Sequence, residues 1–163
     1  RNSIMEYSTK FLNRLREEII ADEGCVLRVY KDHLGYDTVG VGHLVLKTDE
    51  EYNYGEGHVI SQTRADELLS RDLKNVLNEC EERLEQWGTY PEEVKLILAN
   101  MAFNLGLPRL LKFQMMILAI NSGDYVRASI EGLDSKWAKQ VYNRAHRLMD
   151  RLRVCMIDKI DNV

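Results

Sequence analysis

Apolar residues recur at helical spacing near the start of the chain. Between residues 6 and 22 they stand three and four positions apart, at Tyr7, Phe11, Leu12, Leu15, Ile19 and Ile20. Residues with this spacing share one face of an α-helix, so the pattern predicts an amphipathic helix over 6–22. Gly24 favours a stop directly beyond it, which leaves Glu23 at the end of the helix.

The pattern changes to that of a small sheet over residues 26–46. β-branched and aromatic residues are interrupted there by glycines, and the letters K-D-H-L-G-Y between two such runs favour a hairpin loop. Residues 47–58 are polar and acidic, so we expect them to form a surface loop. Val59 and Ile60 are expected to add a short third strand.

Helical spacing returns after Ser61, a residue type that often caps the N-terminus of a helix. The helix that follows is predicted to run for about 20 residues, long enough to link two lobes. The segment 92–105 is apolar almost all round, which indicates a central buried helix with Gly106 as its C-cap. Shorter helices are predicted over 109–121, 124–132, 135–141 and 143–157.

These elements predict an α+β fold, with a small N-terminal antiparallel β-sheet lobe joined by a long helix to a mostly helical C-terminal lobe. A length of 163 residues favours a single domain, which we place at residues 5–163. The expected parts are a β-rich lobe with the cleft wall at 24–60, a linking helix at 61–83, and a helical lobe at 6–22 and 91–157. Arg1 to Ile4 are expected to be an added leader, with Met5 as the natural start.

The composition is typical of a globular protein, with 45% hydrophobic and 29% charged residues. The net charge of −4 is uneven, because residues 1–107 hold 12 Lys and Arg against 20 Asp and Glu, whereas residues 108–153 hold 9 against 4. The C-terminal part is therefore expected to face a polyanion, either a nucleic acid or the bacterial wall. Scattered basic residues without a nucleic-acid-binding motif argue against nucleic acid.

Cys25, Cys80 and Cys155 form no C-x-x-C motif, and their odd number favours thiols in a reducing compartment over a disulfide framework. No stretch approaches the roughly 20 apolar residues of a membrane span, so stable membrane insertion is not expected. The N-terminal residues do not have the pattern of a signal peptide. A cytoplasmic monomer is the default expectation.

Two carboxylates and a threonine are the candidate chemical groups. Glu23 ends the first helix, Asp32 follows nine residues later at the hairpin, and Thr38 comes six residues after that on the returning strand. Two carboxylates across a cleft suit glycoside hydrolysis, in which one group stays protonated and the other stays ionised. We expect Glu23 to be the more enclosed and protonated group and Asp32 the wetter, charged one. From the pattern alone, solvated surface carboxylates remain the default interpretation.

Three sequence motifs favour the catalytic interpretation of these carboxylates over the solvated one. The letters E-G-x5-Y-K-D-x2-G-Y-x-T-x-G-x-G-H, from Glu23 to His43, resemble the active-site signature of the tailed-phage lysozyme family, which is glycoside hydrolase family twenty-four of the T-even type. N-M-A-F-N-L-G from Asn100 and S-K-W-A-K-Q-V-Y-N-R-A-H-R from Ser135 resemble two further segments of the family, in the same order. The resemblance therefore covers most of the chain.

The resemblance implies a muramidase, or endolysin, that hydrolyses the β-1,4 bond between N-acetylmuramic acid and N-acetylglucosamine in bacterial peptidoglycan, with inversion and without a metal or cofactor. It implies that Glu23 is the general acid and that Asp32 and Thr38 position the attacking water. Arg144 matches an arginine that pairs with the catalytic glutamate. The enzyme would stay in the host cytoplasm and reach the wall only after the membrane is permeabilised.

The resemblance also implies residues outside the catalytic group. Substrate contacts are expected at Leu44, Phe103, Met116 and Glu131, and a structural pair is expected between His43 and Asp72. Met116 and Glu131 replace a small polar residue and an asparagine that are usual in the family.

Two other interpretations stay open. The chain could be a catalytically weak peptidoglycan-binding module of the same fold, although the joint presence of Glu23, Asp32 and Thr38 argues against it. It could also be a helical protein-interaction domain, which leaves the spacing of those three residues as an accident.

Overall fold

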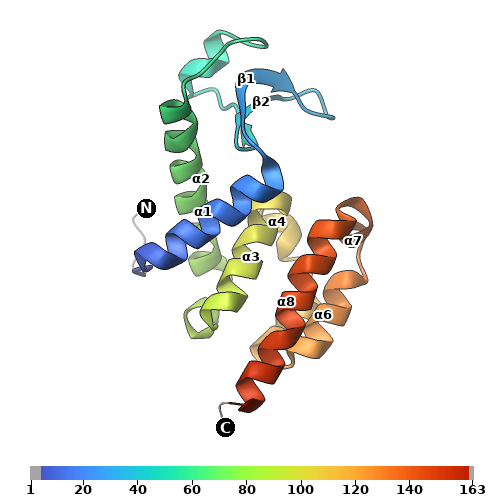
Figure 1. The fold of residues 1–163 in the computed structure, drawn as a ribbon. Helices are drawn as coiled ribbons and strands as arrows, with labels where there is room; N and C mark the ends of the chain where they lie inside the picture. Colours follow the sequence, from blue (N-terminus) through green and yellow to red (C-terminus); the bar gives the residue numbers. More distant parts are fainter. Residues whose placement is uncertain (1–4, 162–163) are drawn as a thin grey trace. The chain divides into compact units, whose positions relative to one another are not determined.

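A computed structural model describes the backbone of residues 5–161 and the side chains of residues 5–155. The expected leader, Arg1 to Ile4, lies outside the described residues. The elements follow one another in the order α1 (Thr9–Glu23), β1 (Val26–Lys31), β2 (Asp37–Gly40), β3 (His43–Leu44), η1 (Glu50–Asn53), α2 (Gln62–Arg83), η2 (Trp87–Thr89), α3 (Glu92–Leu105), α4 (Leu107–Leu110), α5 (Gln114–Asn121), α6 (Tyr125–Leu133), α7 (Lys136–Gln140) and α8 (Tyr142–Asp161). Figure 1 shows their course along the chain. The α+β class predicted from the sequence is confirmed, because a small three-stranded sheet near the N-terminus is followed by helices.

The chain divides into two compact units, which we describe separately. The sheet unit is Tyr7–Leu77, and the helical unit is the remainder of the described chain. Helix α2 contributes to both, because the division falls between Leu77 and Asn78. Residues 6–22 are predicted to join the helical lobe, whereas α1 belongs to the sheet unit. The assignment of the chain to a single domain stays a prediction.

Helix α1 has clear signals at both ends. Ser8 is extended and its hydroxyl accepts the N–H of Phe11 at 3.0 Å, which satisfies one of the N–H groups that the first turn leaves without a helical partner. At the other end Gly24 has a φ of 72° and donates its N–H to the carbonyl of Ile20 at 2.8 Å. A positive φ is easily reached only by glycine, so the helix ends at Glu23.

The sheet is antiparallel with the order β1-β2-β3, and its register divides the side chains between two faces. Val39 pairs with His43, and Val29 and Val39 are buried in a cluster with Ile60, Ala65 and Leu68. Because Ala65 and Leu68 belong to α2, this face of the sheet packs against that helix. Successive residues of a strand point to opposite faces, so Tyr30 and Thr38 belong to the other face.

The third strand predicted over Val59 and Ile60 is a short bridged segment beside β1. The third strand is His43–Leu44, which follows β2 after the two residues Val41 and Gly42. Val59 forms only an isolated bridge with Arg28. Ile60 is buried in the core cluster, and its N–H donates to the carbonyl of Leu27 at 2.9 Å, so this segment lies along β1 without forming a strand of its own.

Helix α3 is the buried centre of the helical unit, as its composition predicted. Glu92 and Glu93 occupy its first turn, where their negative charges are stabilised by the positive end of the helix dipole. Gly106 caps its C-terminus with a φ of 78°. The residues of α3 that are buried are Val94, Leu96, Ile97, Leu98, Ala99, Asn100, Met101, Ala102 and Leu105.

The predicted helix over 109–121 is two helices, α4 and α5. The chain turns at Phe113, whose ψ of 56° leaves the helical region, and the N–H of Phe113 closes the turn on the carbonyl of Leu110 at 3.0 Å. The ring of Phe113 then packs edge-on against Trp137 with their centroids 6.0 Å apart. Tertiary packing of one aromatic side chain therefore explains a break that helical spacing alone did not indicate.

Helices α6 and α8 lie side by side in the helical unit, as Figure 1 shows. Gly132 of α6 permits this approach, because a Cβ at that position would stand 3.2 Å from the sulfur of Met116 and still nearer to the sulfur of Met149. None of the helices in the described part of the chain combines the length and apolar character needed to cross a membrane.

Candidate active site

The carboxyl group of Glu23 lies against the turn between β2 and β3. A Cβ built on Gly42 would stand 3.4 Å from Cδ of Glu23 and 3.5 Å from its Oε2. Gly42 has a φ of 61°, so both the backbone conformation and the close approach favour glycine there. Glu23 is partly buried and holds its place at the last position of α1.

Asp32 is held by the backbone of the hairpin that follows β1. Its Oδ1 accepts the N–H of Leu34 and the N–H of Tyr36, each at 2.9 Å. The hydrogen bond from Tyr36 is the largest influence on the pKa of Asp32, which lies below its usual value even though partial desolvation opposes the shift. The hairpin therefore keeps Asp32 ionised, as expected for its proposed role.

Thr38 lies on the central strand of the sheet and is buried. Its Oγ1 donates its hydrogen to the carbonyl of Tyr36 at 3.1 Å, so its lone pairs remain for accepting a hydrogen bond. Thr38 is paired with Tyr30 on one side and with Leu44 on the other. Paired residues project from the same face, so these three side chains form a row across the sheet.

Tyr30 links the two carboxylates electrostatically. Its phenol has a raised pKa, caused first by burial and then by the negative charges of Glu23 and Asp32. Both carboxylates therefore act on the same side chain from within the sheet unit. Tyr30 is part of the first motif and stands on β1, two residues before the turn residue Asp32.

His43 is buried between two carboxylates. Its Nδ1 lies 2.6 Å from Oδ2 of Asp72, the partner expected from the sequence, and its Nε2 lies 2.7 Å from Oδ2 of Asp49. A carboxylate oxygen at each ring nitrogen favours the protonated imidazole, in which both nitrogens donate. Burial opposes this charge, but the bonds to Asp72 and Asp49 outweigh it and raise the pKa of His43.

The burial of Asp49 was not predicted, because an acidic residue in a polar stretch indicates exposure to solvent. It is instead 2% exposed and accepts the N–H of Leu46 at 2.8 Å and Nη2 of Arg71 at 2.7 Å. Burial raises the pKa of Asp49, but the hydrogen bonds from His43, Leu46 and Arg71 prevail and the pKa is lowered. The His43 cluster, meaning His43, Asp49, Asp72 and Arg71, joins β3 and the following loop to α2.

Glu51 is a second buried acid in the same loop. Its side chain is 1% exposed and accepts a bidentate pair of hydrogen bonds from Arg64, from Nε at 3.0 Å and from Nη2 at 2.8 Å. The hydrogen bond to Arg64 is the main reason that the pKa of Glu51 is lowered. The segment predicted as a solvated surface loop is therefore fixed to α2 at two points.

Arg144 lies on α8 in the helical unit and is buried. Its Nε donates to Oδ1 of Asn100 on α3 at 2.9 Å, a contact that the sequence analysis missed. Asn100 is fully buried, and it begins the N-M-A-F-N-L-G segment that the sequence analysis singled out. The pairing of Arg144 with Glu23 stays a prediction.

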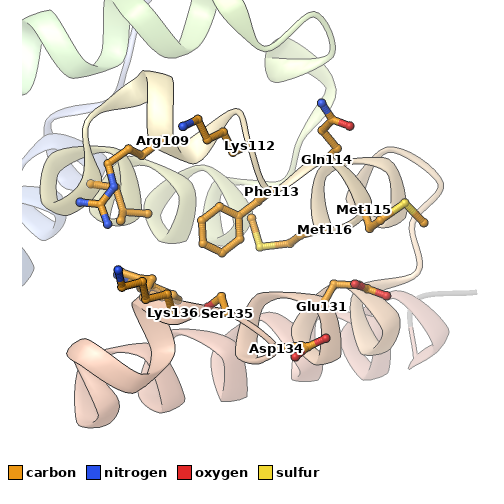
Figure 2. A pocket seen from close by; sticks show the side chains of 12 residues that line it. Arg109, Lys112, Phe113, Gln114, Met115, Met116, Glu131, Asp134, Ser135 and Lys136 are labelled. Carbon is orange, nitrogen blue, oxygen red and sulfur yellow. The ribbon is translucent and has the colours of Figure 1, made fainter.

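Met116 and Glu131, two of the expected substrate contacts, line a pocket of about 400 Å³ within the helical unit. Figure 2 shows their side chains on opposite sides of it, together with Phe113. Met116 is 1% exposed, so its side chain forms part of the floor, and Glu131 is paired with Arg127 at 2.8 Å. Three cationic residues, Arg109, Lys112 and Lys136, also line the pocket.

The two other expected substrate contacts, Leu44 and Phe103, are not among the residues that line this pocket. Leu44 is half exposed on β3, next to Thr38 in the sheet, and Phe103 is partly exposed on α3. Their contact with a saccharide stays a prediction. Among the residues whose side chains are described, no group of three or more His, Cys, Asp or Glu is arranged to hold a metal ion.

Comparison with known proteins adds independent information. The family model described as Phage lysozyme matches residues 21–153, which include Glu23, Asp32, Thr38 and Arg144. The chain is 30% identical over 153 residues to the pre-baseplate central spike protein Gp5 of Enterobacteria phage T4, covering 82% of this chain and 26% of that protein. It is 27% identical to the probable T4-type lysozyme 2 of Dictyostelium discoideum, covering 85% of this chain and 92% of that protein.

A further relative is the peptidoglycan hydrolase gp36 of Pseudomonas phage phiKMV, with 27% identity over 84% of this chain and 15% of that protein. The chain thus spans about a quarter of the T4 spike protein and nearly the full length of the Dictyostelium protein. The family model covers most of the sheet unit and most of the helical unit. The chain belongs to the phage lysozyme family.

Proposed function

We propose that this protein is a muramidase that cleaves the β-1,4 bond between N-acetylmuramic acid and N-acetylglucosamine in peptidoglycan. Membership of the phage lysozyme family supports a peptidoglycan-cleaving enzyme, as does a relative that is named a peptidoglycan hydrolase. The observation that carries the proposal is the hairpin backbone that holds Asp32 ionised, in a segment matched by the family model that also contains Glu23 and Thr38.

Glu23 is the proposed general acid. Its carboxyl gives a proton to the glycosidic oxygen as the bond from that oxygen to C1 of N-acetylmuramic acid breaks. The turn at Gly42 borders the Glu23 carboxyl, since a Cβ at position 42 would stand 3.4 Å from Cδ of Glu23, and a neighbour on one side limits where the carboxyl can point. Arg144 is the proposed partner that keeps this carboxyl oriented.

Asp32 and Thr38 are the proposed holders of the attacking water. Both groups can only accept from that water, since Asp32 is ionised and the Thr38 hydrogen is already donated to the carbonyl of Tyr36. A water that donates both hydrogens to these two acceptors directs a lone pair outward, toward C1. As the water oxygen bonds to C1, Asp32 takes the proton that the water releases.

The expected stereochemical outcome is inversion, because water rather than a carboxylate attacks C1. An inverting pair needs room for that water, which corresponds to carboxyl groups separated by roughly 6.5–9.5 Å. The proposed saccharide contacts are Leu44 beside Thr38 and, in the helical unit, Phe103, Met116 and Glu131. Passage from the host cytoplasm to the wall after membrane permeabilisation stays a prediction.

The experiment that tests this function compares the wild-type protein with Glu23→Gln on purified peptidoglycan. Clearing of the suspension reports cleavage, and the fraction of protein that pellets with the wall reports binding. We expect clearing by the wild-type protein and at least a hundredfold loss with Glu23→Gln, without loss of pelleting. If neither protein clears the suspension and both pellet with it, the chain is a wall-binding module of this fold.

A further inference from the structure

We infer that the pocket of the helical unit binds the stem peptide of peptidoglycan, the short peptide attached to N-acetylmuramic acid, and that Arg109, Lys112 and Lys136 recognise a free carboxylate of that peptide. The inference rests on the proposed function and deepens it, because it names a part of the substrate that enters this pocket in addition to the saccharide. It also gives a site to the excess positive charge of residues 108–153, which the cleavage reaction does not use.

The cationic residues of this pocket have no described opposite charge to pair with. Arg109 belongs to α4, Lys112 follows it in the turn to α5, and Lys136 begins α7. All three residues are exposed, and none forms an ion pair with another described residue. A pocket wall that concentrates charge of one sign attracts a ligand of the opposite sign, so the ligand is expected to carry an anionic group.

The floor of the pocket is apolar and is fixed before any ligand arrives. Trp137 is 3% exposed, and its Nε1 donates to Oδ1 of Asn104 at 2.7 Å. The ring of Phe113 packs edge-on against Trp137, and Met116 lies beside Phe113 in Figure 2. Because these side chains are already ordered, little further ordering opposes the binding of a ligand on them.

The other end of the pocket is acidic. Figure 2 shows Glu131 and Asp134 at the end of the pocket that lies away from the cationic residues. Glu131 is paired with Arg127 at 2.8 Å, whereas Asp134 is exposed and has no ion pair among the described residues. A nucleic acid or a wall polyphosphate would be repelled at this end. A ligand that carries both a carboxylate and an amine matches the two ends.

The stem peptide is the part of peptidoglycan that carries both charges. Its glutamyl residue is joined through the side-chain carboxyl and keeps a free α-carboxylate, unless the wall is amidated there. Its diamino acid keeps a free amine wherever the peptide is not cross-linked. A guanidinium or ammonium group forms charge-assisted hydrogen bonds with a carboxylate, which a neutral amide in its place does not reproduce. The pocket therefore predicts a preference for walls with a free glutamyl carboxylate.

A soluble peptide tests the inference without any cleavage. The probe is N-acetyl-L-alanyl-γ-D-glutamyl-L-lysine amide, which carries one carboxylate and one amine, and it is compared with the same peptide amidated at the glutamyl α-carboxyl. Binding is followed by proton–nitrogen NMR at the indole N–H of Trp137, with the other tryptophan, Trp87 on η2, as the internal reference. We expect the free peptide to shift only the Trp137 signal, and the amidated peptide to bind at least about tenfold more weakly.

Arg109→Gln tests the cationic end of the pocket. We expect its affinity for the free peptide to fall about tenfold, and its KM on unamidated peptidoglycan to rise by a similar factor with little change in kcat. Arg109 is exposed, so the melting temperature should stay within about 2 °C. Lys139→Gln is the matched control, because Lys139 is exposed on α7 without lining the pocket, and we expect it to behave as the wild-type protein.

Equal affinities for the free and the amidated peptide would overturn the inference, as would a Trp137 signal that responds to inorganic polyphosphate and not to the peptide. Equal peptide affinities of Arg109→Gln and Lys139→Gln would also overturn it. None of these results depends on Glu23. A wild-type protein that binds the free peptide at Trp137 and leaves peptidoglycan uncut would overturn the proposed function alone.

Discussion

The carboxyl group of Glu23 faces Gly42 within the sheet unit, so that a Cβ at position 42 would stand 3.4 Å from Cδ of Glu23. The end of α1 and the turn between β2 and β3 therefore meet at the carboxyl group that is proposed to donate the proton. The contact explains why a glycine is needed at this turn, beyond its φ of 61°.

Gly42→Ala is expected to lower activity more than its effect on folding explains. The positive φ alone is expected to lower the free energy of unfolding by about 1–2 kcal/mol, and the added methyl group is expected to displace the Glu23 carboxyl and reduce kcat by about tenfold or more. Peptidoglycan clearing and urea unfolding measure the two effects separately.

Gly55→Ala is the control for that change. Gly55 has a φ of 74°, and a Cβ there meets no atom within 4 Å, so the substitution has the same backbone penalty without a neighbour. We expect it to be destabilised like Gly42→Ala and to keep its kcat. Equal kcat values for the two variants would show that the contact with Glu23 has no bearing on activity.

Much of this architecture follows from local signals. The bounds of α3 are those that the sequence predicted, because Glu92 and Glu93 favour a helix start and Gly106 can adopt the positive φ of a helix end. The hairpin and the place of Asp32 follow from the letters between two β-rich runs. These are elements for which neighbouring residues alone decide the conformation.

The features that sequence analysis missed depend on distant partners. Asp49 and Glu51 are acids in a polar loop, and only the positions of Arg71 and Arg64 on α2 make them buried groups. The two-residue strand β3 has no pattern of its own and exists because β2 pairs with it.

Arg64→Ala is expected to destabilise the protein strongly. Glu51 would remain buried without the arginine that donates two hydrogen bonds to it, and breaking a buried pair from one side lowers the free energy of unfolding by about 3–5 kcal/mol. Urea unfolding at neutral pH measures this loss.

Arg127→Ala serves as the comparison, because the Arg127 side chain is 60% exposed and its pair with Glu131 is expected to contribute less than about 1 kcal/mol. Similar losses in the two variants would refute the buried role of Glu51.

His43 is expected to stabilise the fold most at mildly acidic pH. Its pKa is raised in the folded protein, so its contribution is fully present below the unfolded value of about 6.5 and disappears as the pH rises through the folded value. Asp49 has a lowered pKa, so its contribution is present above about 3.9 and is lost as the pH falls through its folded value.

The difference in free energy of unfolding between the wild-type protein and His43→Ala should therefore be largest near pH 5 and smaller at pH 9. Urea unfolding at several pH values measures it. His43→Ala should also lose more thermal stability than turnover, because His43 faces α2 rather than the row of Tyr30, Thr38 and Leu44. A difference that grows steadily from pH 5 to pH 9 would contradict the protonated state of His43.

Thr38→Val tests how the attacking water is held. Valine has nearly the same shape but no hydroxyl oxygen to accept from the water, so we expect kcat to fall by roughly 10- to 100-fold, with a loss of about 1 kcal/mol in stability from the missing bond to the carbonyl of Tyr36. Thr38→Ser retains the hydroxyl and is expected to keep most of the activity. Equal activity of the valine and serine variants would remove Thr38 from the reaction.

The most direct test of the account identifies the sugar at the newly formed reducing end. Peptidoglycan treated with the wild-type protein or with Glu23→Gln is reduced with borohydride, and the fragments are identified by mass spectrometry. We expect fragments that end in reduced N-acetylmuramic acid from the wild-type protein, and none above background from a folded Glu23→Gln. Fragments that end in reduced N-acetylglucosamine, or equal release by the two proteins, would contradict the account.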